Sequence, residues 1–233
     1  MPREPDTLIA LPRSFTPEDM AKLFRHPKKG DPLVPSPAAL ERYEGNPADA
    51  CAFGYRRAAE VLVEYTQTHG NETFLFYPIV FMYRHYVELM LKKLIVALDE
   101  PGIRRSPELS EEQRKKLCQG RKAHSLQMLW DLVRERLKAL GTGTPEDIEG
   151  VNFYIRQLDE IDPGAVSFRY TNAIEETKAR LKKAQKAGLD VDIHTFAEAM
   201  DRLANYLEGV DNQLWASIEV YNEMVAECCD SAF

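Results

Sequence analysis

The feature that most constrains the fold is the stretch Phe74–Leu98 (FLFYPIVFMYRHYVELMLKKLIVAL), which would be apolar on nearly every side of a helix. Such a helix is expected at the centre of a bundle, because neighbouring helices must cover all of its apolar surface. Its polar exceptions are Arg84, His85, Glu88, Lys92 and Lys93.

Four of these residues form a polar stripe. At about 100° per residue, Arg84, His85, Glu88 and Lys92 fall within a sector roughly 100° wide. Burying unpaired charge is costly, so the stripe should be paired, hydrogen-bonded or open to a cleft. In a functional interpretation, His85 acts as general acid or base, Glu88 orients it, and Arg84 and Lys92 hold a phosphate. In a structural interpretation, Glu88 only pairs with Arg84 and Lys92 in a salt-bridge network.

Composition limits the class of protein. The chain has 233 residues, 44% hydrophobic and 29% charged, which suits one large or two small soluble domains. A net charge of -7 argues against a sequence-blind nucleic-acid coat but allows a local basic pocket. The N-terminal sequence lacks the apolar core of a signal peptide, and the apolar run 74–83 is too short to cross a bilayer. Four cysteines without metal-ligand spacing are expected to be reduced thiols. We therefore expect a cytoplasmic protein without a metal, a cofactor or a membrane span.

The N-terminal 48 residues differ from the rest of the chain. They hold nine of its 14 prolines, which prevents a long helix. Thr16 and Pro17 could begin a short helix to about Arg25. Residues 1–48 are therefore expected to form an arm that lies on the body of the protein or on a second subunit.

Residues 49–227 are expected to form one helical domain, followed by a tail at 228–233. Apolar spacing of three and four residues predicts helices. Their approximate ranges are 47–69, 77–98, 124–140, 145–161 and 192–227, the last being one long helix or a broken pair. In the polar segment 101–122, Ser110 could cap a short helical turn. We also expect a charged helix or hairpin at 175–186. A short strand pair is possible around 166–192. The predicted class is an all-α bundle of about five main helices.

Common catalytic fingerprints are missing. The sequence contains no GxGxxG, P-loop, HExxH or GxSxG motif. A P-loop or Rossmann enzyme is close to excluded, because the strands that these motifs need are missing too.

Two further segments are candidate ligand sites. His124 stands at a predicted helix start, behind Arg121 and Lys122, where it could cap the helix or contact a phosphate. Arg169 and its neighbour Tyr170 follow a Pro-Gly turn and suit stacking on a base or clasping a phosphate. Arg169 suits equally well an ion pair with Glu88 or Asp162. Trp130 and Trp215 are assigned to the core or to a dimer interface.

Taken together, four elements resemble a group of mostly uncharacterised bacterial proteins related to the HEPN superfamily. The elements are RHxxELxLK at 84–92, His124-Ser125-Leu126, Ile161-Asp162-Pro163 leading to Phe168-Arg169-Tyr170, and the helical pattern from Phe196 to Leu207. The resemblance covers roughly residues 50–215.

The resemblance implies a four- or five-helix bundle that forms a homodimer, with a cleft where paired helices meet. Many HEPN domains are metal-independent ribonucleases of toxin–antitoxin, phage-defence or RNA-processing systems, and others bind nucleotides or partner proteins. The implied partners are therefore RNA or a nucleotide, and a protein such as an antitoxin or another defence component.

This chain departs from the usual HEPN nuclease motif, which is Arg, four to six residues, then His on a late helix. None of its five histidines follows an arginine at that spacing. A ribonuclease of this branch would use another set, with Arg84, His85, Glu88 and His124 as catalytic candidates. The candidate RNA-binding residues are Lys92, Arg121, Arg169 and Tyr170. In such an enzyme a histidine takes the 2′-OH proton, and Arg or Lys stabilises the developing phosphate charge. The alternative is a non-catalytic helical interaction module.

Overall fold

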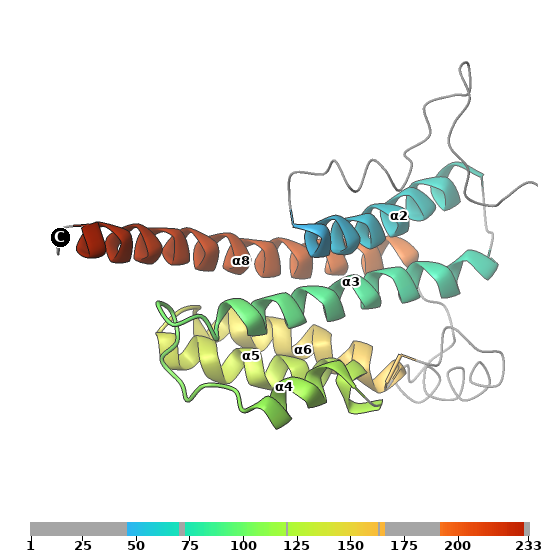
Figure 1. Cartoon of the computed structure of the whole chain (residues 1–233). Helices are drawn as coiled ribbons and strands as arrows, with labels where there is room; N and C mark the ends of the chain where they lie inside the picture. Colours follow the sequence, from blue (N-terminus) through green and yellow to red (C-terminus); the bar gives the residue numbers. More distant parts are fainter. Residues whose placement is uncertain (1–45, 70–72, 120, 163, 166–191, 231–233) are drawn as a thin grey trace, which may run out of the picture. The chain divides into compact units, whose positions relative to one another are not determined.

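The computed structural model describes residues 46–69, 73–119, 121–162, 164–165 and 192–230 (Figure 1). The chain divides between Glu44 and Gly45, and all described residues belong to the second unit. Within these ranges the structure has six α-helices and no strand, which confirms the all-α class. The predictions for 16–25, for the strand pair at 166–192 and for the charged segment 175–186 lie outside the described residues. No helix in the described ranges is both long and apolar enough to cross a membrane.

The first two helices form a hairpin. Helix α2 spans Pro47–His69, and a single 3-10 turn at Thr73–Leu75 leads into α3, which spans Phe76–Ala97. Helix α3 packs against α2, α5 and α8. In Figure 1 α2 and α8 lie along one side of α3, and α5 and α6 lie along the other. The expectation that this apolar helix is central is confirmed.

The remaining helices follow the local sequence signals. They are α4 (Glu111–Cys118), α5 (Leu126–Leu140), α6 (Pro145–Ile161) and α8 (Ile193–Asp230), with a second 3-10 turn at Arg121–His124 before α5. Serine and threonine hydroxyls cap three of them at their N-termini, because they accept backbone N–H groups that have no partner within the helix. The capping residues are Ser110, Ser125 and Thr144. Gly141 ends α5 with a left-handed φ of 76°.

Two sequence expectations need adjustment. The side chain that caps α5 belongs to Ser125, whose hydroxyl accepts the N–H of Met128 at 3.3 Å, so the capping role expected for His124 is wrong. The predicted long helix or broken pair is one continuous helix, Ile193–Asp230, so the first residues of the predicted tail are helical.

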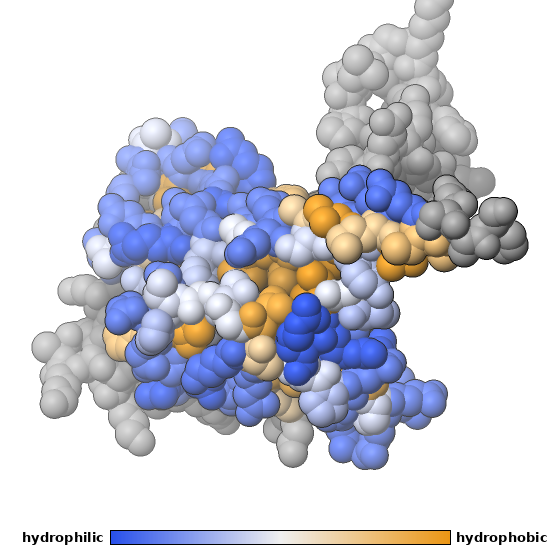
Figure 2. All heavy atoms as spheres, turned by 90° about the vertical axis from the view of Figure 1, so that its left-hand side faces the viewer, coloured by the Kyte–Doolittle hydropathy of each residue, from blue (hydrophilic) through white to orange (hydrophobic). Residues whose placement is uncertain are grey.

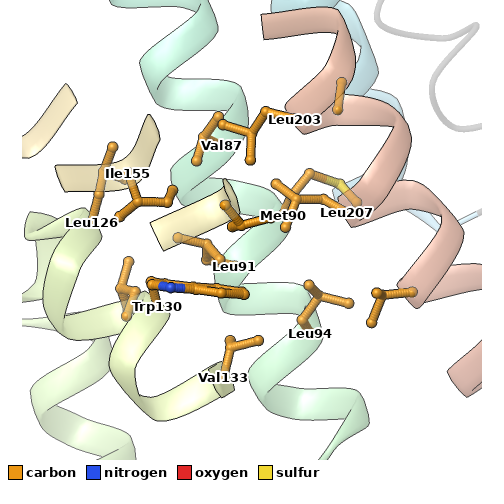
Figure 3. Close-up of a cluster of buried hydrophobic side chains, with 14 of the residues drawn as sticks. Val87, Met90, Leu91, Leu94, Leu126, Trp130, Val133, Ile155, Leu203 and Leu207 are labelled. Carbon is orange, nitrogen blue, oxygen red and sulfur yellow. The ribbon is translucent and has the colours of Figure 1, made fainter. Parts of the chain in front are cut away.

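The core forms where α3 meets α5, α6 and α8. Figure 3 shows α3 residues inserted between side chains of the other three helices. Trp130 of α5 is fully buried at this junction, in agreement with its assignment to the core, whereas Trp215 of α8 is partly buried. The other labelled residues are Val87, Met90, Leu91 and Leu94 of α3, Leu126 and Val133 of α5, Ile155 of α6, and Leu203 and Leu207 of α8. Each buried side chain of this size contributes about 1.5–3 kcal/mol relative to exposure.

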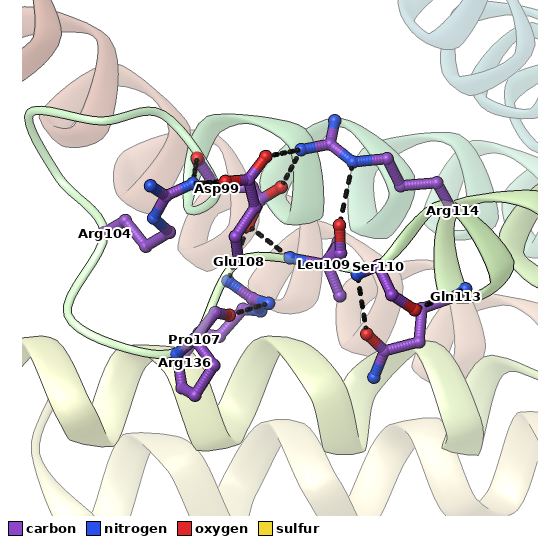
Figure 4. A network of polar contacts seen from close by, with 9 residues as sticks. All are labelled: Asp99, Arg104, Pro107, Glu108, Leu109, Ser110, Gln113, Arg114 and Arg136. Atoms are coloured by element: carbon purple, nitrogen blue, oxygen red, sulfur yellow. Dashed lines mark hydrogen bonds and ion pairs between the residues drawn. The ribbon is translucent and has the colours of Figure 1, made fainter.

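A polar network anchors the connection between α3 and α4 (Figure 4). The carboxylate of Asp99, which is buried, accepts the N–H of Leu109 at 3.2 Å and Nη1 of Arg136 at 3.1 Å, and it pairs with Arg114. Nη2 of Arg136 donates to the carbonyl oxygen of Pro107 at 3.1 Å. This network fixes the loop against α5.

A second network joins the helices on the other side of α3. Oε1 of Glu208 on α8 accepts hydrogen bonds from Nη1 of Arg56 on α2 and from the hydroxyl of Tyr86 on α3, each at 2.7 Å. Burial and the hydrogen bond to Glu208 raise the pKa of Tyr86. The carboxylate of Glu208 therefore links α2, α3 and α8.

Candidate functional site

The polar stripe of α3 carries two charges that are almost fully buried. Arg84 and Glu88 are each 1% exposed. They lie one helical turn apart, and Nη1 of Arg84 is 3.3 Å from Oε2 of Glu88. Buried charges of this kind require partners, and the structure provides them from the 3-10 turn before α5 and from the C-terminal end of α6.

The second oxygen of Glu88 binds two donors. Oε1 accepts Nζ of Lys92 at 2.8 Å and Nδ1 of His124 at 2.8 Å. Burial alone would raise the pKa of Glu88, but the hydrogen bonds and charges of Lys92 and His124 outweigh it and hold the pKa below its usual value. Glu88 is therefore ionised at neutral pH and can only accept hydrogen bonds.

This pairing fixes the tautomer of His124. Because the Glu88 carboxylate only accepts, Nδ1 of His124 must carry the proton. In the neutral ring, Nε2 is then the nitrogen with a free lone pair. The side chain of His124 is 42% exposed, whereas that of Glu88 is 2% exposed. A buried carboxylate that orients a partly exposed imidazole is an arrangement suited to general-base chemistry.

Arg84 holds the backbone of His124. Its Nη2 donates to the carbonyl oxygen of His124 at 2.6 Å, and its Nε is 3.4 Å from Oδ2 of Asp162, which is fully buried. Desolvation lowers the pKa of Arg84, and the charges of Asp162, Glu88 and Asp159 counteract this shift. The guanidinium therefore lies beneath the surface and acts on His124 through its main chain.

Asp159 of α6 holds the residues that follow His124. Its Oδ1 accepts the N–H of Leu126 at 2.8 Å, and its Oδ2 accepts the hydroxyl of Ser125 at 3.1 Å. Oδ1 also lies 3.9 Å from Nη2 of Arg84. Three different side chains thus hold this segment. Glu88 binds the ring of His124, Arg84 binds its carbonyl oxygen, and Asp159 binds the first turn of α5.

We call the six residues that meet here the charged cluster. They are Arg84, Glu88, Lys92, His124, Asp159 and Asp162. The cluster joins α3, α5 and α6 and presents an oriented imidazole and an ammonium group, the side chain of Lys92 being 29% exposed. These groups can accept a proton and stabilise a negative charge. Among the described residues, no group of His, Cys, Asp or Glu side chains is arranged to hold a metal ion.

The structure separates the sequence candidates into three sets. It brings together Arg84, Glu88, Lys92 and His124. His85 lies on the side of α3 that faces α2, where its ring meets Tyr55 edge-on at 4.5 Å and stacks on Phe81 at 5.8 Å.

The other three candidates lie wholly or partly outside the described residues. Arg121 belongs to the 3-10 turn that ends at His124, but its side chain is outside the described part of the structure. Arg169 and Tyr170 lie outside the described residues altogether.

Sequence reasoning missed Asp159, and it considered Asp162 as a turn residue and as a possible partner of Arg169 but not of Arg84. A signal was available, because Asp159 and Asp162 continue the spacing of Val151, Ile155 and Leu158, which form the buried face of α6. A carboxylate on an apolar helix face points to a buried cation. That cation is Arg84.

A shallow depression on the outer face of α6 shares no residue with the charged cluster. Phe153 and Tyr154 contribute its aromatic lining, and one helix provides all the lining residues. Since this depression is open and is lined by a single helix, we assign it no chemistry.

Comparison with known proteins adds no family assignment. No family model matches the sequence, and no curated protein and no solved structure is significantly similar to the chain.

Proposed function

We propose that this protein is a HEPN-like, metal-independent endoribonuclease of a bacterial defence or toxin–antitoxin system, acting in the cytoplasm as a homodimer. The observation that carries the proposal is the 2.8 Å hydrogen bond from Nδ1 of a partly exposed His124 to the buried carboxylate of Glu88. The sequence resemblance, including the Arg84–Lys92 element and the His124-Ser125-Leu126 element, supports RNA as the substrate.

In the proposed reaction His124 is the general base. Its Nε2 takes the proton of a ribose 2′-OH, and the 2′ oxygen attacks the adjacent phosphorus. The bond from phosphorus to the 5′ oxygen breaks, and the leaving oxygen takes a proton from the imidazolium or from water. The products are a 2′,3′-cyclic phosphate and a free 5′-OH. No metal ion is required for any of these steps.

The neighbouring side chains have distinct roles in this proposal. Glu88 orients His124 and stabilises the imidazolium. Lys92 stabilises charge on the phosphate. Arg84 is a positioning residue, because it is buried beneath His124. His85 has no role in the chemistry, since its ring packs between Tyr55 and Phe81.

The test is RNA cleavage in the presence of EDTA by wild type, His124→Gln and His194→Gln. His194 is a matched control, because it is an exposed histidine outside the charged cluster. Its Nδ1 lies 3.0 Å from Nε2 of Gln67, which is not a member of the cluster either. We expect His124→Gln to lower the rate by on the order of 10²–10⁴-fold and His194→Gln to leave it unchanged. Equal rates in all three proteins, or no cleavage by the wild type, would remove the catalytic proposal.

The predicted RNA-binding residues Arg121, Arg169 and Tyr170 have a separate test. Each alanine variant should bind single-stranded RNA more weakly in a filter-binding assay, and the two arginine variants should reduce the salt dependence of binding. Unchanged affinity in all three would assign RNA contact to other residues.

The second candidate function is a non-catalytic helical interaction module. The burial of Arg84, Glu88 and Asp162, with Arg84 paired to both carboxylates, favours it. In this case the charged cluster only joins α3, α5 and α6. The wild type would then cleave no RNA, and Glu88→Gln would lower the melting temperature without changing any activity.

A further inference from the structure

The C-terminal part of α8 carries an unusual number of exposed apolar side chains. Val220 and Met224 are 56% and 60% exposed, and Tyr221 and Val225 are 40% and 43% exposed. Residues 219–229, which we call the α8 tip, are all helical and all exposed. In Figure 1 this part of the helix continues beyond α2 and α3. Figure 2, which views the molecule from the end toward which α8 runs, shows hydrophobic residues at the centre of this face. Exposed apolar surface concentrated on one short element indicates an interaction site.

The apolar face of the α8 tip continues a line of contact that begins in the core. Leu214 and Ile218 are buried, and Tyr221 and Val225 follow them at helical spacing. The intervals of four, three and four residues are typical of the seam between two packed helices. Within the bundle other helices cover this seam, whereas at the tip it reaches solvent. A helix is therefore the kind of element that would extend the existing packing.

A row of glutamates borders the apolar face. Glu219, Glu223 and Glu227 follow one another at intervals of four residues, and like charges at this spacing destabilise a helix. At about 100° per residue they fall within a sector roughly 80° wide that lies next to Val220. No lysine, arginine or histidine follows Arg202 in the sequence, so the tip itself contains no cation. The α8 tip therefore combines an apolar face with an acidic edge.

Electrostatics distinguishes the candidate occupants of this surface. An identical tip would bring the same acidic edge, and nucleic acids and anionic lipid surfaces also carry negative charge, so all three would be repelled. A neutral apolar helix would leave the glutamate row without a counter-charge. Lysine or arginine side chains at the edge of a partner helix would pair with the row, while their aliphatic stems lie over Val220 and Met224. The charge of the edge thus favours a cationic partner.

We propose that the α8 tip binds a cationic amphipathic helix of another protein. The apolar face of this partner packs on Tyr221, Met224 and Val225, and its lysine or arginine side chains lie along the glutamate row. The inference uses neither the charged cluster nor RNA cleavage, so it stands or falls independently of the proposed function.

The probe is a synthetic amphipathic peptide of leucine and lysine, about 18 residues long so that it can form a helix in water. A twin peptide carries glutamate at every lysine position. Fluorescence anisotropy measures the binding of each labelled peptide to the full chain at about 0.15 M salt. We expect the lysine peptide to bind about tenfold or more tightly than its glutamate twin.

Two sets of substitutions separate the apolar face from the acidic edge. The double variant Met224→Ser, Val225→Ser should raise the Kd of the lysine peptide on the order of 10–100-fold. The triple variant Glu219→Gln, Glu223→Gln, Glu227→Gln should raise it about tenfold and weaken its dependence on salt. Because all five side chains are exposed, the helical content measured by circular dichroism should stay close to that of the wild type.

Each set has a matched control on other helices. Phe153→Ser removes an exposed apolar side chain of α6. The triple variant Glu135→Gln, Glu149→Gln, Glu160→Gln removes the same amount of exposed negative charge from α5 and α6. Both controls should bind the lysine peptide as the wild type does, which separates a contact at the tip from general attraction to an acidic protein.

Hydrogen exchange locates the bound peptide, which should slow the exchange of amides 219–229. Absence of binding, equal binding by the tip variants, or protection confined to other helices overturns the proposal. Protection of these amides as the protein alone is concentrated would place a second copy on the tip. Protection in the dilute protein alone would show that another part of the same chain covers it. Either of these two results also overturns the proposal.

Discussion

Nδ1 of His124 donates to Oε1 of Glu88 across 2.8 Å, although 36 residues separate the two in the sequence. The pair joins the central helix to the start of α5 and combines a buried, ionised carboxylate with a partly exposed imidazole. The proposed chemistry depends on this relationship. Two of the predictions below concern Glu88, and the other two remove Arg84 or Asp159, which hold the chain at and after His124.

Glu88→Gln should lower RNA cleavage on the order of 10²–10⁴-fold. Glutamine keeps the size of the side chain but loses the charge that fixes the tautomer of His124 and stabilises its protonated form. The measurement is the single-turnover rate on a short RNA, with Glu149→Gln on the exposed face of α6 as the matched control. If Glu88→Gln cleaves as fast as Glu149→Gln, the carboxylate does not assist His124.

Arg84→Met should reduce the free energy of unfolding by about 3–5 kcal/mol, because the buried carboxylates of Asp162 and Glu88 would each lose an ion pair. Urea denaturation measures this change. Arg57→Met is the control, since Arg57 is exposed and pairs with Glu60 and Glu64 at the surface, where ion pairs contribute little. Similar small effects in both variants would contradict the structural role of Arg84.

Glu88 should also make stability depend on pH in the acid range. Its pKa in the folded protein is lower than the ordinary value of 4.5, so the folded state favours the ionised form. This contribution is fully present above the unfolded-state pKa, and it is lost as the pH falls through the lower folded-state value. The difference in unfolding free energy between wild type and Glu88→Gln should therefore narrow below about pH 4.5. Urea titrations at a series of pH values measure it, and a constant difference down to pH 3 would refute the assignment.

Asp159→Ala should act on His124 through its backbone. The substitution removes the acceptor of the Leu126 N–H and of the Ser125 hydroxyl, with an expected loss of about 1 kcal/mol in stability. We expect kcat for RNA cleavage to fall by about tenfold with little change in KM, since a misplaced base affects the chemical step. Asp159→Asn keeps one acceptor oxygen and should recover part of the rate. A loss of stability with an unchanged kcat would restrict Asp159 to a structural role.

The helices were largely predictable because their signals are local. Proline at the start of α6, serine before α4 and α5, and glycine after α5 mark helix ends through groups that are close together in the sequence. The central position of α3 was predictable as well, since a helix that is apolar on nearly all sides can be stable only when other helices surround it.

The charged cluster was predictable only in part. Arg84, Glu88 and Lys92 share one helix, so helical geometry places them together. The same geometry grouped His85 with them, whereas the structure turns its ring toward α2. A sector roughly 100° wide spans more than one neighbouring helix, so residues in the same sector can face different partners.

The amino-acid sequence by itself determined where most of the helices begin and end, which of them is innermost, and that charge would be buried on it. Only the tertiary structure decided that Glu88 receives His124, that Arg84 meets Asp162, and that Asp159 holds the start of α5. The physical reason is that periodicity records which side of a helix is apolar or charged, while the identity of the opposing residue depends on how separate helices pack. That packing is set by the shapes of many side chains together, among them Trp130 and the leucines around it.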